Sequence, residues 1–133
     1  MKRRHLVSFP DLPDIERLLK EKGISTEFIH IENGTSRINL KIRSDVESEI
    51  NGMGPVIRKE DLELLYEQLD TLKDDDVLVL AGSIPSGMPQ SIYRDIMSRL
   101  QSKQIKIAVD ATKDLLMNVL AYHPFVIKPN NHE

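Results

Sequence analysis

Polar side chains that could bind a phosphate, a cation or a sugar follow three apolar runs in the second half of the chain. The runs and the residues after them are Val77–Ala81 with Gly82 and Ser83, 105–109 with Asp110, and 125–127 with Lys128, Asn130 and Glu133. A glycine permits close approach of a ligand, and a serine offers its hydroxyl and amide to an oxyanion. The lysine supplies a cation, and the carboxylate and amide oxygens are ligands that Mg²⁺ prefers, often through water.

The elements that must position these residues alternate between strand and helix. Amphipathic segments at 89–102 and 115–120 separate the three apolar runs. This order, with continuously apolar strands, predicts a parallel α/β sheet. Because ligands of such sheets bind beyond the carboxyl ends of the strands, we expect the polar residues to share one edge. Taken singly, 82–87 also fits a plain connecting loop, and Asp110 also fits a helix cap.

The first half of the chain has a different pattern. A helix is predicted over 14–22, where apolar residues recur on one stripe. Short alternating runs then predict a β-hairpin at 28–42, with a further short strand at Ser48–Asn51. A second amphipathic helix is predicted over 59–72. The acidic segment 74–76 is interpreted as a charged turn that ends this helix. It is not interpreted as a metal site, because the side chains of consecutive residues diverge.

The composition excludes several classes of protein. The chain has 133 residues, enough for one domain with a core of its own. Its charged fraction of 29% and formal net charge of −3 give no sign of nucleic-acid or membrane binding. The absence of cysteine rules out disulfides, thiolate catalysis and zinc–sulfur sites. No run is as long and apolar as a membrane span or a signal peptide, so we expect a cytoplasmic protein.

Five ordered segments carry motifs. They are Ser36-Arg37-Ile38-Asn39-Leu40-Lys41, Glu49-Ile50-Asn51-Gly52-Met53-Gly54-Pro55, Ala81-Gly82-Ser83-Ile84-Pro85-Ser86-Gly87, Val109-Asp110-Ala111-Thr112 and Lys128-Pro129-Asn130-Asn131-His132-Glu133. Together they resemble the PfkB family of ribokinase-like carbohydrate kinases, whose segments read T-R-x-N-x-K, T-E-[IF]-N-x-x-G-P, S-G-S-L-P-x-G, D-[ST/A]-S and K-P-N-x-x-E. Order and spacing agree from about residue 14 onward, and the second motif favours the 1-phosphofructokinase branch over tagatose-6-phosphate kinases.

The resemblance implies a fold and an activity. The fold would be part of a ribokinase-like three-layer α/β sandwich over residues 1–133, with 27–52 as a small β-hairpin lid and 59–133 as the core segment. The activity would be transfer of the γ-phosphoryl group of ATP, with Mg²⁺, to fructose 1-phosphate, which yields fructose 1,6-bisphosphate. Because the lid pairs subunits in this family, the resemblance also implies a homodimer. From the charge balance we expect no nucleic-acid partner and no membrane partner.

The resemblance assigns the substrate-binding roles residue by residue. Arg37 and Ser83, with Gly82 beside the serine, would hold the phosphate that the substrate already carries, in one shared cavity. Arginine suits this role because its planar guanidinium can bind a phosphate through two donors. Asn39 and Lys41 would line the sugar side.

The resemblance also assigns the nucleotide side. Lys128 is expected near the phosphates of the nucleotide, and Asp110, Asn130 and Glu133 would organise Mg²⁺ through its waters. Two family segments find no match here: the N-terminal G-G-x-[GA]-x-N, which grips the sugar, and the G-A-G-D segment, which supplies the anion hole and the catalytic base. We therefore expect no catalytic base within residues 1–133 and no turnover by this chain alone.

Three other functions stay open on the sequence. The chain could belong to a tagatose-6-phosphate kinase, or it could be a remnant that binds phosphate or nucleotide without catalysis. A generic flavodoxin-like interaction domain without a ligand is the third, and the five motifs argue against it.

Overall fold

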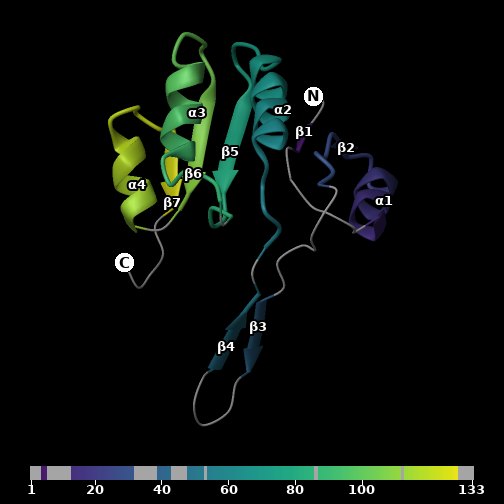
Figure 1. Ribbon diagram of the computed structural model, residues 1–133. Helices are drawn as coiled ribbons and strands as arrows, with labels where there is room; N and C mark the ends of the chain where they lie inside the picture. The colour runs from purple at the N-terminus through teal and green to yellow at the C-terminus, as the bar shows by residue number, and fades with distance from the viewer. Residues whose placement is uncertain are drawn as a thin grey trace. The chain divides into compact units, whose positions relative to one another are not determined.

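The computed structural model describes residues 4–5, 13–31, 39–42, 48–52, 54–85, 87–111 and 113–128. The chain divides into two compact units, Met1–Leu65 with Pro85–Gly87 and Tyr66–Ile84 with Met88–Glu133. The helices and strands of both units are labelled in chain order in Figure 1.

The second unit is built on a three-stranded parallel sheet. Its strands are β5 (Val77–Ala81), β6 (Lys106–Asp110) and β7 (Val126–Lys128), in the order β5-β6-β7. Ala81 pairs in register with Asp110, and Asp110 pairs with Lys128, so the three strands end at one level. The predicted parallel sheet is confirmed.

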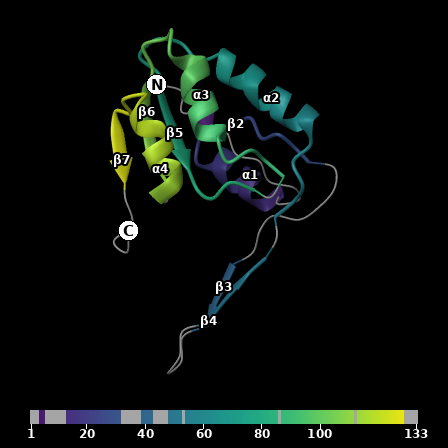
Figure 2. The ribbon, with the colours of Figure 1, turned by 60° about the vertical axis from the view of Figure 1, so that its left-hand side comes forward.

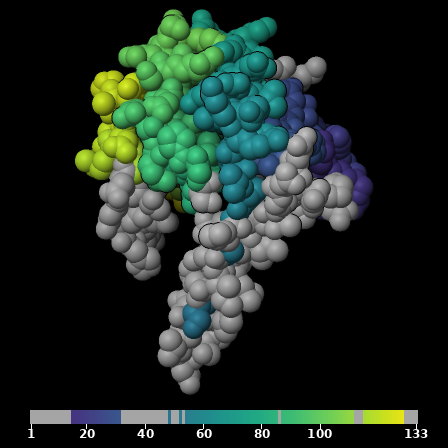
Figure 3. Space-filling view, in the orientation of Figure 1, coloured from purple at the N-terminus to yellow at the C-terminus, as the bar shows by residue number. Residues whose placement is uncertain are grey.

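Two helices pack on one face of this sheet. They are α3 (Ile92–Leu100) and α4 (Lys113–Leu120), which lie on the same side of the strands in both ribbon views (Figures 1 and 2). Their side chains form the surface in front of the sheet (Figure 3). The core of this unit consists of Leu69, Leu78, Leu80, Ile92, Tyr93, Ile96, Met97, Leu100, Ile107, Val109, Ala111, Leu115 and Val119. The helix α3 therefore buries its whole apolar stripe, whereas α4 buries Leu115 and Val119 and leaves Leu120 40% exposed.

The opposite face of the sheet carries apolar side chains that the described residues leave open. Burial alternates along β5, so that Leu80 is 7% exposed whereas its neighbour Val79 is 62% exposed. Continuously apolar strands are typical of sheets that are covered on both faces. The difference has a topological cause: strands added one after another in the same direction place both right-handed crossover helices on the same side.

The helix α2 (Lys59–Asp70) begins in the first unit and ends in the second. In the second unit its last residue, Asp70, receives a bidentate ion pair from Arg99 of α3, with N···O distances of 2.7 and 2.5 Å. The Arg99 guanidinium also lies 5.0 Å from the centre of the Tyr66 ring. Lys103 donates to the carbonyl oxygens of Asp70, the last residue of α2, and of Leu72, at 2.6 and 2.8 Å. These contacts fix the end of α2 to α3.

The acidic turn before β5 has a structural role. The Asp74 carboxylate accepts the backbone N–H of Gln104 at 2.9 Å, and the Asp76 carboxylate accepts that of Lys73 at 2.8 Å. Asp75 has a positive φ of 67° and donates its own N–H to the Gln104 carbonyl at 2.9 Å. The turn therefore joins the starts of β5 and β6, in agreement with its interpretation as a charged turn.

The first unit contains the helix α1 (Pro13–Glu21) and two small sheets. The strand β1 (Arg4–His5) pairs in parallel with β2 (Ser25–Thr26). The strand β3 (Asn39–Ile42) pairs antiparallel with β4 (Ser48–Asn51), with Lys41 opposite Glu49.

The predicted hairpin at 28–42 is described only in part, and its strand β3 has a partner that the sequence did not predict. The antiparallel partner of β3 is β4, which was expected only as an additional strand. Within 28–31 the structure has a single isolated bridge residue, Ile29, and no regular strand. The segment 32–38, including the turn signal at its start, lies outside the described residues. Alternating polarity fixes which residues share a face, but it does not decide which neighbouring strand becomes the partner.

Candidate functional site

The carboxyl end of β5 leads into a glycine with a special backbone conformation. Gly82 has a φ of +96°, a region that side chains of L-residues rarely adopt. A Cβ atom at this position would meet nothing within 4 Å, so the backbone conformation, and not the space, favours glycine here. The residue after it, Ser83, is exposed. The predicted strand-end position of Gly82 and Ser83 is therefore confirmed.

A carboxylate and an ammonium group lie side by side at the carboxyl ends of β6 and β7. The Lys128 ammonium lies 3.1 Å from each carboxylate oxygen of Asp110. Both side chains are partly exposed. They are in register with Ala81, which lies on the same face of β5 as the exposed Val79, so they lie on the sheet face opposite the one that packs against α3 and α4. Lys128 is thus held by a carboxylate at the edge where a ligand phosphate is expected.

One residue of this edge was not anticipated from the sequence. The hydroxyl of Tyr93, in α3, donates a hydrogen bond of 2.9 Å to the carbonyl oxygen of Gly82. Burial, and next the negative charge of Asp110, raise the pKa of Tyr93 to about 12. The sequence pattern placed Tyr93 only on the apolar stripe of its helix, and nothing in that pattern shows where its hydroxyl goes.

The remaining predicted site residues lie in the first unit or outside the described residues. Asn39 and Lys41 lie on β3 of the first unit, where they pair in register with Asn51 and Glu49. Arg37, Asn130 and Glu133 lie outside the described residues. Within the described ranges, no group of three or more acidic or histidine side chains could hold a metal ion. Nor does any helix in those ranges have the length and apolar character needed to cross a membrane.

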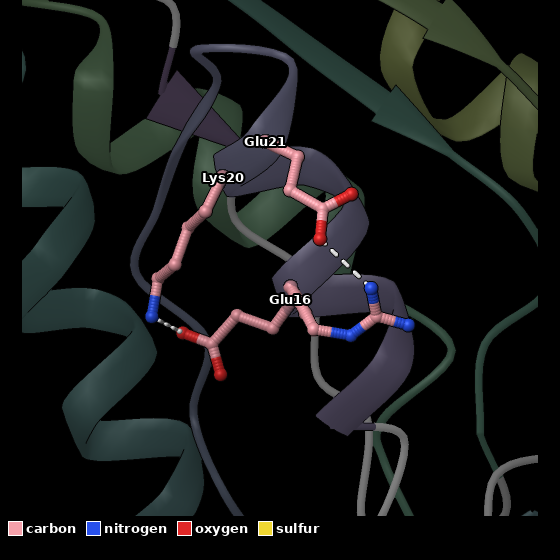
Figure 4. A pocket seen from close by; sticks show the side chains of 4 residues that line it. Glu16, Lys20 and Glu21 are labelled. Carbon is pink, nitrogen blue, oxygen red and sulfur yellow. Dashed lines mark hydrogen bonds and ion pairs between the residues drawn. The ribbon is translucent and has the colours of Figure 1, made fainter.

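A shallow hollow on α1 carries no sign of a ligand site. It is lined by Glu16, Arg17, Lys20 and Glu21 (Figure 4). The charged groups around it pair along the helix, Lys20 with Glu16 at 2.9 Å and Arg17 with Glu21 at 2.8 Å. The Glu16 carboxylate also accepts the Thr26 hydroxyl at 3.0 Å, and the hydrogen bonds from Lys20 and Thr26 lower the pKa of Glu16. These are the pairs expected at i and i+4 on an exposed helix.

The fold and the sequence identify the family. Residues 13–133 match the model of the pfkB family of carbohydrate kinases, and the chain belongs to this family. It is 37% identical over 119 residues to the 1-phosphofructokinase of Bacillus subtilis, a match that covers 90% of this chain and 39% of that protein. It is 33% identical over 119 residues to the D-tagatose-1-phosphate kinase of Bacillus licheniformis, with the same coverage of 90% and 39%.

A solved structure shows the same fold. The phosphofructokinase-2 of Escherichia coli aligns with a TM-score of 0.81 at 20% identity, over 98% of this chain and 45% of that chain. The fold is therefore that of the ribokinase-like phosphofructokinases. The chain spans about two fifths of the length of the curated relatives that it matches.

Proposed function

We propose that this chain forms the phosphate-binding edge of an ATP-dependent 1-phosphofructokinase, which converts fructose 1-phosphate to fructose 1,6-bisphosphate. The observation that carries the proposal is the common level at which β5, β6 and β7 end, with Gly82 and Ser83, Asp110 and Lys128 directly after or at those ends. Membership of the pfkB family and 37% identity to a 1-phosphofructokinase support the choice of reaction.

The substrate side of the proposal rests on Ser83. Its amide and hydroxyl follow a glycine in a positive-φ conformation, an arrangement that suits the binding of an oxyanion by backbone and side-chain donors. From the resemblance, we propose Arg37 as a second ligand of the sugar phosphate, and Asn39 and Lys41 as groups that contact the sugar. Phosphoryl transfer depends on such positioning and on stabilisation of charge, so these contacts would set the substrate affinity.

The nucleotide side rests on the pair of Lys128 and Asp110. A lysine held 3.1 Å from a carboxylate is placed at the edge in advance, and it can then donate to a nucleotide phosphate. The Asp110 oxygens are of the type that Mg²⁺ prefers, and they fit a role as an acceptor for its waters, together with Asn130 and Glu133. When bound, the metal would neutralise negative charge on the phosphate oxygens.

A tagatose-phosphate kinase is the second candidate. The specific observation in its favour is the 33% identity to a D-tagatose-1-phosphate kinase.

We propose, from the resemblance alone, that residues 27–52 form the lid, that the lid pairs two subunits, and that the protein acts in the cytoplasm.

Calorimetry with the purified 133-residue chain tests the proposal. We expect binding of fructose 1-phosphate, weaker binding of tagatose 6-phosphate and tagatose 1-phosphate, and no binding of unphosphorylated fructose, which is the control for the phosphate. A coupled assay for ADP on the same samples is expected to stay at background, since the chain spans 39% of the relative whose activity is named. Equal binding of fructose and fructose 1-phosphate would contradict the phosphate site, and a preference for either tagatose phosphate would favour the second candidate.

A further inference from the structure

We propose that Tyr93 is a positioning residue for phosphate binding, because its hydroxyl fixes the peptide between Gly82 and Ser83 in the orientation that presents the Ser83 amide to a sugar phosphate. This inference rests on the proposed function and adds a residue to its site. It begins with the hydrogen bond of 2.9 Å from the Tyr93 hydroxyl to the Gly82 carbonyl.

The donor in this hydrogen bond has a fixed position. Tyr93 is only 9% exposed, and it belongs to the buried face of α3 together with Ile92, Ile96 and Met97. A ring packed in this way cannot follow a moving loop, because protein interiors are close-packed. The core of the unit therefore determines where the Gly82 carbonyl oxygen finds its partner.

The acceptor belongs to a peptide that has another orientation available. Gly82 has no side chain and a φ of +96°, so little steric hindrance opposes rotation of the peptide after it. The carbonyl of Gly82 and the N–H of Ser83 belong to one planar trans peptide, and they point to opposite sides of it. A carbonyl directed to Tyr93 consequently directs the Ser83 N–H away from α3. Without the hydroxyl, the peptide could rotate and present an oxygen atom to the ligand, which would repel a phosphate.

The direction in which the Ser83 N–H then points suits the binding of a phosphate. Asp110 and Lys128 lie on the face of the sheet opposite α3. Because the Gly82 carbonyl points to Tyr93 of α3, we infer from the trans geometry of the peptide that the Ser83 N–H points toward the side of these two residues. The phenol also keeps its proton, because burial and the charge of Asp110 raise the pKa of Tyr93 to about 12. It therefore remains a donor to the carbonyl at every pH at which the protein would work.

The test uses the 133-residue chain and its Tyr93→Phe variant, which removes one oxygen atom and keeps the packed ring. Nuclear magnetic resonance follows the Ser83 amide while fructose 1-phosphate is added, and calorimetry measures the affinity for ATP with Mg²⁺. We expect the dissociation constant for fructose 1-phosphate to rise about tenfold, the scale of one hydrogen bond. The affinity for ATP should stay within about twofold, since Lys128 does not depend on this peptide. The matched control is Tyr66→Phe, which removes the same atom from α2 and should change neither affinity.

Each outcome decides the inference. Equal loss of both affinities in Tyr93→Phe would show a merely structural role, and an unchanged affinity for fructose 1-phosphate would exclude any role; both overturn the inference and leave the proposed function standing. No response of Ser83 in the unsubstituted chain would overturn the proposed function as well. If Tyr93→Phe does not fold, fluorotyrosine labelling of the unsubstituted chain replaces it. The Tyr93 resonance should then shift with the same concentration dependence as Ser83, and no shift at saturation would overturn the inference.

Discussion

Lys128 and Asp110 are register partners at the ends of β7 and β6, and the lysine ammonium lies 3.1 Å from both oxygens of the carboxylate. Substitutions of the two residues are expected to change the affinity for ATP without metal in opposite directions. Asp110→Asn removes a negative charge beside the expected phosphate, so we expect ATP without metal to bind severalfold more tightly. The same change should abolish the gain in affinity that Mg²⁺ gives, because the acceptor for the metal's waters is weakened.

Lys128→Met should instead weaken ATP binding about tenfold or more, both with and without Mg²⁺, since it removes a charge-assisted hydrogen bond. Lys106→Met is the matched control, because Lys106 lies at the opposite end of β6, 5.9 Å from the Phe125 ring. Calorimetry with ATP in the presence and absence of Mg²⁺ checks all three variants. If Lys106→Met weakened binding as much as Lys128→Met, bulk charge and not a site would explain the affinity.

Because one face of the sheet is buried and the other is exposed, substitutions at neighbouring residues of β5 should lower the free energy of unfolding by unequal amounts. Leu80 is 7% exposed and packs into the core, so Leu80→Ala should lower the free energy of unfolding by about 2–5 kcal/mol. Val79 is 62% exposed, and Val79→Ala should cost less than about 1 kcal/mol. Urea unfolding measures both values. A cost for Val79→Ala close to that of Leu80→Ala would mean that another part of the chain covers this face.

A buried carboxylate at the start of α2 predicts a dependence of stability on pH. Asp61 is 5% exposed, and its oxygens accept the Arg58 backbone N–H at 3.0 Å and the Arg58 side chain at 3.2 and 3.3 Å. The side-chain hydrogen bonds from Arg58 are the largest cause of a pKa of Asp61 below its ordinary value near 3.8. A lowered folded-state pKa contributes stability above the unfolded value, and this contribution is lost as the pH falls through the folded value.

Asp61→Asn should therefore lower the free energy of unfolding by about 1–3 kcal/mol at pH 7. The difference in free energy of unfolding between Asp61→Asn and the unsubstituted chain should shrink below pH about 4, where the Asp61 carboxylate of the unfolded chain begins to take up a proton. Thermal unfolding between pH 3 and 7 measures this difference. Glu60→Gln, at an exposed position of the same turn, is the control. A difference that stays constant over this pH range would show that the charge of Asp61 does not matter.

The proposed second ligand of the sugar phosphate gives a prediction that depends on the resemblance alone. Arg37→Ala should raise the dissociation constant for fructose 1-phosphate by about tenfold to a hundredfold, because a guanidinium can donate two hydrogen bonds to one phosphate. Arg94→Ala, on the exposed side of α3, should leave it unchanged. Calorimetry with fructose 1-phosphate compares the two variants, and equal affinities would remove Arg37 from the site.

The sequence predicted those parts of the fold for which the hydrophobic pattern is compatible with a single arrangement of strands and helices. Continuous apolar runs separated by amphipathic helices led to the parallel order of β5, β6 and β7, and therefore to the common edge of Ser83, Asp110 and Lys128. The pairing of β3 with β4 was missed, since the choice among several short alternating strands depends on turns and tertiary contacts and not on alternation.

The supporting contacts of the site could not be predicted, because they join residues that no local pattern relates. The Tyr93 hydroxyl meets the Gly82 carbonyl eleven residues earlier only through the way α3 packs on the sheet. In the same way, Asp61 reads as an ordinary acidic residue of a first helical turn, and only the structure shows that it is buried beneath Arg58. Local composition gives the type of side chain, whereas packing gives its partner.

The central claim, that this chain carries the phosphate-binding edge of a 1-phosphofructokinase, is tested most directly in a chimera. The matched 119 residues of the Bacillus subtilis 1-phosphofructokinase would be replaced by the corresponding residues of this chain. We predict that the chimera phosphorylates fructose 1-phosphate in preference to fructose 6-phosphate, and that Ser83→Ala in it raises the KM for fructose 1-phosphate about tenfold with little change in the KM for ATP. A chimera that is folded by circular dichroism but does not phosphorylate fructose 1-phosphate, or one whose KM is unchanged by Ser83→Ala, would contradict the claim.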